Sequence, residues 1–245
     1  MGIRGRAERL RVSSDPSDAV RSLPYSRRST KGPEADLLER VISDWPGPGP
    51  IVFREPRMPT GYPDVVAVML RKSTVRVNAQ RAGLRLPHLR LVHHIHTMRR
   101  SSEQELMARL LFRPTQMPRL LSDLEGAGLI RRAGKTVFAR YAPSPFVARR
   151  IIAVEAKMRD WHRAIEQAIS NTWFASHSFV LLPHKCWTGN VGRAARRHGI
   201  GVLLFNGTRL SLQVRPRTHS LPGSYGSWLV NEWALRVATS TTSDD

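Results

Sequence analysis

The stretch Ile151-Ile152-Ala153-Val154-Glu155-Ala156-Lys157 has the pattern of a buried β-strand that ends in two charges. Side chains on a strand alternate between its two faces, so Glu155 and Lys157 are expected to project from the same face. Burying an acid and a base is costly unless the two pair with each other or hold an ion. The alternative is a strand end that reaches solvent, where both charges are simply hydrated.

The charge of the chain is strongly positive. Its 245 residues include 39 Lys and Arg against 19 Asp and Glu, a formal net charge of +20. All but five of the basic residues are Arg, whose planar guanidinium suits phosphate groups. This excess predicts a polyanionic partner, and nucleic acid is the first candidate. A compositional bias would explain the preference for Arg over Lys, but not the excess of bases over acids.

Several classes of protein are not expected from this sequence. The single cysteine, Cys186, excludes a disulfide framework and a cysteine-based zinc site. No run of about eighteen apolar residues predicts a membrane span, and the N-terminus lacks the apolar core of a secretory signal. There is no GxxxxGK[ST] loop, so an ATP-driven motor is not expected. We therefore expect a cytoplasmic, nucleoid-associated protein without a membrane partner.

Apolar periodicity predicts helices and strands on both sides of residues 72–146. A helix is expected from Pro33, a favoured first helical residue, and an apolar strand is expected at Tyr62–Leu70. Asp64 opens that strand, and its alternative role is to cap a turn after a proline. The other expected elements are a strand at 51–53, a helix at 161–174, strands at 179–182, 201–205 and 209–214, a short helix at 192–198 and an amphipathic helix at 223–237.

Residues 72–146 have a different pattern, with three helices and a hairpin. The first helix is expected at 88–98, and the second is expected to start at Ser102, with Glu105 at the capping-box spacing. The third has apolar residues at the helical spacing and is expected to close at Gly126 or Gly128. A two-stranded hairpin turning at 133–135 follows it.

The stretch LLSDLEGAGLIRRAGKTVFARY (residues 120–141) resembles the third helix and the wing of the winged helix-turn-helix family. The resemblance covers about residues 86–142, and in that family the third helix enters the major groove while the wing touches the backbone. It implies six DNA-contacting residues: Thr115, Gln116 and Arg119 from the helix, and Arg131, Arg132 and Lys135 from the wing. Winged helices also serve as protein–protein modules, but the basic wing favours DNA.

Pro63-Asp64 and Glu155-Ala156-Lys157, in the order helix, strand, strand, strand, helix, strand, resemble the PD-(D/E)XK nuclease-like superfamily. The resemblance covers residues 33–71 and about 148–206. It implies an α/β (α+β) fold with a restriction-endonuclease-like mixed sheet flanked by helices. Asp64 and Glu155 are 91 residues apart, far more than the usual hairpin. A winged-helix insertion would account for this, because the cost of closing a loop rises slowly with its length.

The residue types fit phosphodiester hydrolysis. Two carboxylates can hold Mg²⁺, which keeps several of its waters and also contacts the substrate phosphate. Asp64 and Glu155 are the expected ligands of Mg²⁺, or of Mn²⁺ in its place. Lys157 would orient or deprotonate the attacking water and stabilise the transition state, and an arginine could not act as the base.

The resemblance also implies supporting residues. In the superfamily a glutamate of the first helix often completes the site; Glu34 is the better placed candidate and Glu39 is the other. Gln167 is expected to contact the substrate or to support the ligands. A histidine cluster at positions 93, 94 and 96 lacks cysteine partners, so a metal site is not expected there.

Together these patterns predict a Mg²⁺-dependent nuclease that binds duplex DNA and acts in repair, recombination or defence. The alternative is a non-enzymatic winged-helix transcriptional regulator on a degenerate nuclease scaffold, and a third reading is RNA processing or protein adaptation. The sequence leaves open whether the protein forms a homodimer. Four parts are expected: a flexible basic arm at 1–32, a nuclease-like domain at 33–71 and 147–215, a winged-helix insertion at 72–146, and a C-terminal helix with a disordered tail at 216–245.

Overall fold

The computed structural model describes Leu23, Tyr25 and residues 31–43, 50–71, 79–142 and 144–240. Most of the basic arm expected at residues 1–32 lies outside the described residues, as do Trp45 and residues 241–245. The chain forms two compact units. Unit 1 contains the described residues of Ser26–Leu70 and Arg149–Pro222, and unit 2 those of Ser17–Tyr25, Arg71–Ala148 and Gly223–Asp245.

Unit 1 is built on a mixed six-stranded sheet in the order β1-β2-β6-β7-β8-β9. The three strands β6, β7 and β8 are parallel, whereas β1 pairs with β2 and β8 with β9 in antiparallel fashion. The mixed α/β class expected from the sequence is therefore confirmed. The strands are β1 (Ile51–Arg54), β2 (Val65–Leu70), β6 (Ala148–Ala156), β7 (His177–Pro183), β8 (Gly201–Phe205) and β9 (Leu210–Val214).

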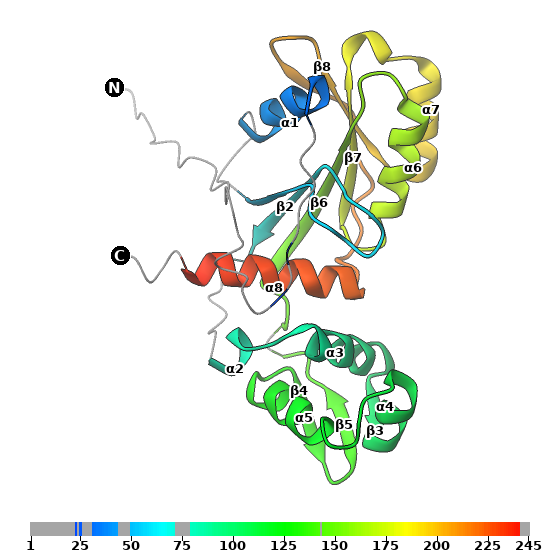
Figure 1. Cartoon of the computed structure of the whole chain (residues 1–245). Helices are drawn as coiled ribbons and strands as arrows, with labels where there is room; N and C mark the ends of the chain where they lie inside the picture. The colour runs from blue at the N-terminus through cyan, green and yellow to red at the C-terminus, as the bar shows by residue number, and fades with distance from the viewer. Residues whose placement is uncertain are drawn as a thin grey trace, which may run out of the picture. The chain divides into compact units, whose positions relative to one another are not determined.

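Helices cover both faces of this sheet (Figure 1). Helix α1 (Pro33–Ser43) packs its apolar stripe on one face, against side chains such as Val154 and Ala156 of β6. Helices α6 (Trp161–Asn171) and α7 (Gly189–His198) pack on the other face, over the apolar side chains of β7 and β8. Because successive residues of a strand alternate in direction, Glu155 points away from the α1 side.

Several boundaries in unit 1 differ from the sequence prediction, and two of the differences have a local cause. The strand expected at Tyr62–Leu70 begins only at Val65, because Pro63 has no amide hydrogen for a sheet ladder. The helix expected to reach Phe174 ends at Asn171, whose carbonyl accepts hydrogen bonds from the amides of Phe174 and Ala175 and so closes the turn. A short 3-10 helix, η1 (His184–Cys186), follows β7.

Unit 2 contains three longer helices in sequence, followed by a hairpin that belongs to a three-stranded sheet in the order β3-β5-β4. The short helix α2 and the strand β3 were not predicted, since each is too short for a periodic pattern. The elements are α2 (Ala79–Ala82), α3 (Leu86–Met98), β3 (Arg100–Ser102), α4 (Glu103–Leu110), α5 (Met117–Gly126), β4 (Ile130–Ala133), β5 (Thr136–Ala139) and α8 (Tyr225–Ser240).

Local signals in unit 2 are confirmed. The Ser102 hydroxyl accepts a hydrogen bond from the Glu105 amide, and the Glu105 carboxylate accepts one from the Ser102 amide, so the capping box is complete. The hairpin turns at Gly134, whose φ of +58° lies in the left-handed region that favours glycine. Helix α5 ends at Gly126, one of the two expected positions.

The prediction that the last helix is amphipathic is wrong. Helix α8 is buried along almost its whole length, and Trp228 and Trp233 are each 1% exposed. Two of its buried polar side chains have partners that are distant in the sequence, as burial generally requires. Asn231 Oδ1 accepts hydrogen bonds from two backbone amides, and Glu232 forms an ion pair with Arg81 at 2.8 Å.

No helix in the described part of the chain is both long enough and apolar enough to cross a membrane.

Candidate functional site

Three polar residues from distant parts of the sequence meet where β6 ends and β2 begins. Asp64 immediately precedes β2, and its Oδ2 accepts a hydrogen bond of 2.7 Å from the amide of Ala156, the last residue of β6. Lys157 Nζ lies 3.9 Å from the same Oδ2. The negative charge of Asp64 raises the pKa of Glu155, so the two acids form one electrostatic unit. The structure thus brings Asp64, Glu155 and Lys157 together.

The first helix contributes one acid to this cluster. Glu34 lies in the first turn of α1, and its Oε2 is 3.5 Å from Lys157 Nζ. The same Nζ donates a hydrogen bond of 2.8 Å to the carbonyl of Ala156. The other candidate, Glu39, instead forms an ion pair with Arg54 of β1. Of the two glutamates expected from the sequence, the structure therefore brings only Glu34 to Lys157.

Glu155 is the most deeply buried member of the cluster, with 2% of its surface exposed. Its Oε1 accepts a hydrogen bond of 2.6 Å from Asn171 Nδ2. Its Oε2 is buried and has no hydrogen-bond partner among the described residues. Burial, and then the negative charge of Asp64, raise the pKa of Glu155 from 4.5 to about 8. In the chain by itself this carboxyl group is therefore largely protonated at neutral pH.

The pKa of Asp64 is also raised above its ordinary value. Burial raises its pKa, while the Ala156 amide and the Lys157 charge lower it by smaller amounts. Glu34 and Glu55 raise it further through their negative charges. Glu55 was not expected at this place. Its amide donates to the Asp64 carbonyl at 2.9 Å, and its φ of 42° is uncommon for a residue other than glycine.

A second residue missed by the sequence analysis is Asn171, at the end of α6. It reaches Glu155 from one turn beyond Gln167, the residue that was expected to support the site. Gln167 Oε1 is buried and has no hydrogen-bond partner among the residues that the structure describes. An asparagine on the buried face of a predicted helix was the available signal, because a buried amide needs a polar partner.

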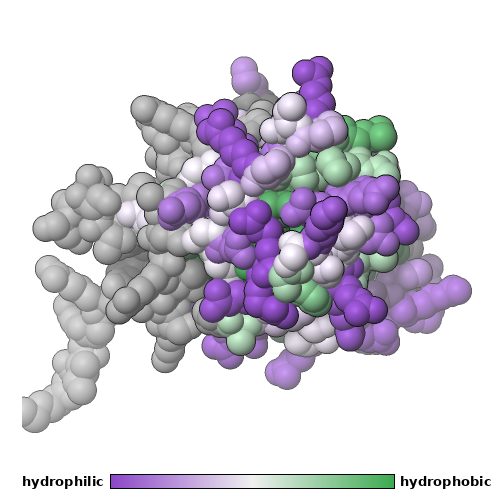
Figure 2. Space-filling view, turned by 90° about the horizontal axis from the view of Figure 1, so that it is seen from below, coloured by the Kyte–Doolittle hydropathy of each residue, from purple (hydrophilic) through white to green (hydrophobic). Residues whose placement is uncertain are grey.

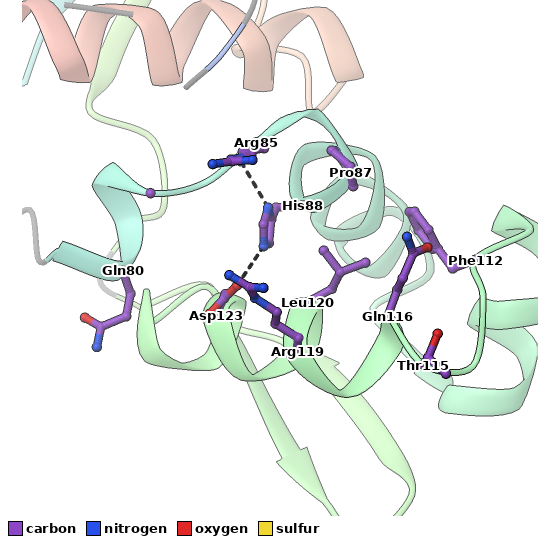
Figure 3. Close-up of a pocket in the computed structure, with 11 residues that line it drawn as sticks. Gln80, Arg85, Pro87, His88, Phe112, Thr115, Gln116, Arg119, Leu120 and Asp123 are labelled. Carbon is purple, nitrogen blue, oxygen red and sulfur yellow. Dashed lines mark hydrogen bonds and ion pairs between the residues drawn. The ribbon is translucent and has the colours of Figure 1, made fainter. Parts of the chain in front are cut away.

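In unit 2, the three residues expected at the third helix line a concavity of about 770 Å³ (Figure 3). Thr115 and Gln116 precede the first residue of α5, and Arg119 lies in its first turn; all three are exposed. The opposite wall comes from α3. There His88 Nε2 bonds to Asp123 Oδ2 at 3.0 Å and so ties α3 to α5.

The three basic residues of the hairpin differ in how strongly they are held. Arg131 is exposed, with its guanidinium 4.5 Å from the centre of the Phe138 ring. Arg132 is half-buried, and both its amide and its Nε bond to the carboxylate of Glu125. Lys135 is exposed in the turn. Figure 2 shows a face of the molecule on which hydrophilic residues predominate, with small hydrophobic patches between them.

The histidine cluster of α3 is engaged in packing. His96 Nε2 bonds to the carbonyl of Leu129 at 3.0 Å, and its ring packs on Tyr141 and Trp228. Burial lowers the pKa of His93 and of His96. Over the described residues, no three His, Cys, Asp or Glu side chains are grouped so that they alone could hold a metal ion.

No protein-family model matches the chain, and no curated protein or solved structure is similar enough to count as a match.

Proposed function

We propose that unit 1 is a PD-(D/E)XK nuclease-like domain that hydrolyses phosphodiester bonds of DNA with the help of Mg²⁺ or Mn²⁺. The observation that carries the proposal is the meeting of Asp64, Glu155 and Lys157 at one end of β6, from positions 91 residues apart. The restriction-endonuclease-like fold is supported by a mixed sheet with α1 on one face and α6 on the other.

The residues present fit a divalent cation. Two neighbouring carboxylates supply hard oxygen donors, which Mg²⁺ prefers. Glu155 Oε2 is buried without a partner among the described residues, and such a group is costly unless something binds it. A cation held by Asp64 and Glu155 would satisfy that oxygen and favour the ionised form of both acids. When bound, Mg²⁺ supplies positive charge beside the phosphate and polarises a water molecule.

The protein groups around this pair have separate tasks in the proposed reaction. The Ala156 amide holds the Asp64 carboxylate in place, and Asn171 holds that of Glu155. Lys157 Nζ, close to Asp64 and Glu34, orients the attacking water and offsets the charge that develops on the phosphate. Water adds to phosphorus and gives up a proton, while the bond from phosphorus to the leaving sugar oxygen breaks and that oxygen takes up a proton.

We further propose that unit 2 is a winged-helix domain that binds duplex DNA. The order α3-β3-α4-α5-β4-β5, with β3 paired to the hairpin, supports this. In such domains the third helix lies in the major groove and the wing contacts the backbone. Arg119 would then contact DNA from α5, with Thr115 and Gln116 from the residues just before it, and the exposed basic residues of the hairpin would contact phosphates.

The decisive experiment is incubation of the purified full-length protein with supercoiled, linear, branched and single-stranded DNA, with Mg²⁺, with Mn²⁺ or with EDTA. We expect cleavage of at least one DNA form that requires the metal and disappears in EDTA. Absence of cleavage on every DNA form would overturn the proposal. A sharp, metal-independent footprint on genomic fragments that persists in a Glu155→Gln variant would instead support the alternative, a non-enzymatic regulator.

The hairpin gives a prediction about DNA affinity. Because Lys135 is exposed and Arg132 is tied to Glu125, Lys135→Ala is expected to weaken duplex binding more than Arg132→Ala. Loss of one phosphate contact should lower the slope of log K against log salt by about 1. Fluorescence anisotropy at several salt concentrations measures this slope. An unchanged slope for Lys135→Ala would show that the hairpin does not contact DNA phosphates.

The hydrogen bond from Asn171 gives a second prediction. Asn171→Ala removes a donor that lowers the pKa of Glu155, so protons should compete more strongly with the metal. We expect metal affinity at neutral pH to fall about 10- to 100-fold, as for other residues that support ligands. Calorimetric titration with Mn²⁺ should show that the deficit shrinks at higher pH. Ser170→Ala is the matched control, because among the described residues the Ser170 hydroxyl bonds to the Glu166 carbonyl alone. A deficit that is the same at every pH would contradict the explanation.

A further inference from the structure

A second concavity lies in unit 1 at the carboxyl ends of the parallel strands. Its volume is about 570 Å³, within the range of roughly 300–1,000 Å³ that is usual for small-ligand clefts. Its walls come from the start of α1 and from the segments that follow β6, β7 and β8. Open α/β sheets characteristically bind ligands at this edge.

This cleft adjoins the proposed catalytic cluster along two segments of the chain. Pro33 and Met158 line it, and each is the immediate sequence neighbour of a cluster residue, Glu34 and Lys157 respectively. Glu34 and Lys157 are themselves 3.5 Å apart. A DNA strand whose phosphate lay at the cluster would therefore have its next nucleotide within reach of the cleft.

The lining of the cleft is apolar inside and charged at the rim. Leu37, Met158 and Phe205 contribute apolar surface, and the last two are only partly buried. Arg40 and Lys185 are exposed residues that also line it, and both carry positive charge. An aromatic side chain beside cations that bind phosphate is the usual combination in sites for unpaired nucleotides.

We propose that this cleft takes one unpaired nucleotide of the DNA strand next to the phosphate that is cut. The proposal rests on the nuclease function proposed above and adds the substrate class. The base would stack on Phe205, while Arg40 and Lys185 would bind the adjoining phosphate. Asp36 lines the cleft from α1, as Arg40 does, and its carboxylate can accept a hydrogen bond from an exocyclic amino group of the base.

A substrate preference follows from this occupant. A base within a duplex is stacked on both sides and paired, so it must leave the helix before it can enter a cleft of this size. The cost of unstacking is least for a base that is mismatched or already single-stranded. Forked, flapped or frayed DNA should therefore be cut in preference to fully paired duplex.

The first test compares cleavage of two duplexes of the same sequence, one fully paired and one ending in a short fork. We expect the wild-type protein to cut the fork at least tenfold faster. Lys185→Ala and Phe205→Ala should each reduce that preference roughly tenfold. Arg197→Ala on α7 and Leu212→Ala on β9, exposed and outside the cleft, are the matched controls. Equal cleavage of fork and duplex by the wild type would overturn the proposal.

The second test does not depend on cleavage. The fork carries 2-aminopurine at an unpaired position, and its fluorescence is recorded with EDTA present while the protein is added. Stacking of 2-aminopurine on Phe205 of the wild-type protein should quench its fluorescence. The Phe205→Ala and Lys185→Glu proteins should leave the fluorescence unquenched. Lys185 is exposed, so its replacement should not disturb folding. Quenching without any cleavage would preserve the nucleotide site and reject the nuclease function. Cleavage without quenching at any unpaired position, or quenching only with forked RNA, would reject the site proposed here.

Discussion

Replacing Lys157 by alanine is expected to lower the rate of metal-dependent DNA cleavage by about two to four orders of magnitude. The ammonium group lies 3.9 Å from Asp64 Oδ2 and 3.5 Å from Glu34 Oε2, with 16% of the side chain exposed. It is thus a positive charge beside one proposed metal ligand, Asp64, and beside Glu34, and it remains accessible to a substrate. Single-turnover cleavage at saturating protein measures the loss, because it separates the chemical step from binding.

A conservative variant separates the two roles proposed for this lysine. Lys157→Arg keeps the positive charge, but its guanidinium cannot act as a base. If charge stabilisation dominates, arginine should restore part of the rate; if proton transfer dominates, it should restore none. Binding of duplex DNA should change little among the three proteins, since the proposed groove and wing contacts with duplex DNA lie in unit 2. A Lys157→Ala protein that cuts as fast as the wild type would show that the cluster is not the catalytic centre.

In the absence of metal, the stability of unit 1 is expected to fall as the pH rises from about 5 to about 8. The pKa of Glu155 is about 8 in the folded chain and 4.5 ordinarily, so the folded state binds the proton more tightly than the unfolded state. The stabilisation is complete below pH 4.5 and is lost as the pH rises through about 8. One pKa unit corresponds to about 1.4 kcal/mol, so the change is of the order of several kcal/mol.

Added Mg²⁺ should reverse this loss. At pH 8 a cation that binds the ionised carboxylates of the folded state, and not the unfolded chain, raises the free energy of unfolding. Denaturant unfolding at pH 5 to 9, with EDTA or with millimolar Mg²⁺, measures both effects. Glu155→Gln should flatten the pH profile and abolish the response to Mg²⁺. Glu39→Gln, which changes an acid paired with Arg54 outside the cluster, should behave like the wild type.

Comparison of the wild type with Glu155→Gln also cancels the contribution of other titrating groups to the pH dependence of stability. Burial lowers the pKa of His93, His96 and His177. These histidines therefore make the free energy of unfolding increase as the pH rises. Their contribution is the same in the wild type and in Glu155→Gln and cancels in the difference. A wild-type protein whose excess stability over Glu155→Gln does not decline between pH 5 and pH 8 would contradict the inferred state of Glu155.

Within unit 1, tertiary packing selected among alternatives that the sequence left open. Glu34 and Glu39 both lie off the apolar stripe of α1, and helical periodicity does not separate them. Arg54 of β1 forms an ion pair with Glu39, whereas Lys157 forms one with Glu34. Asn171 and Glu55 reach the acids from α6 and from the end of β1. Their roles depend on the register of the sheet and the placement of helices on it, which no short stretch of sequence specifies.

What the sequence determined by itself is local. The apolar alternation of Ile151–Ala156, the capping box at Ser102 and the turn at Gly134 each depend on a few neighbouring residues, because strand periodicity, helix capping and a positive φ are satisfied over short spans. The burial of α8 along almost its whole length, the Glu155 oxygen without a hydrogen-bond partner among the described residues, and the pKa of about 8 were decided only by the tertiary structure. Burial and the approach of distant charges arise when segments far apart in the chain pack together, and these two quantities set the ionisation of the candidate site.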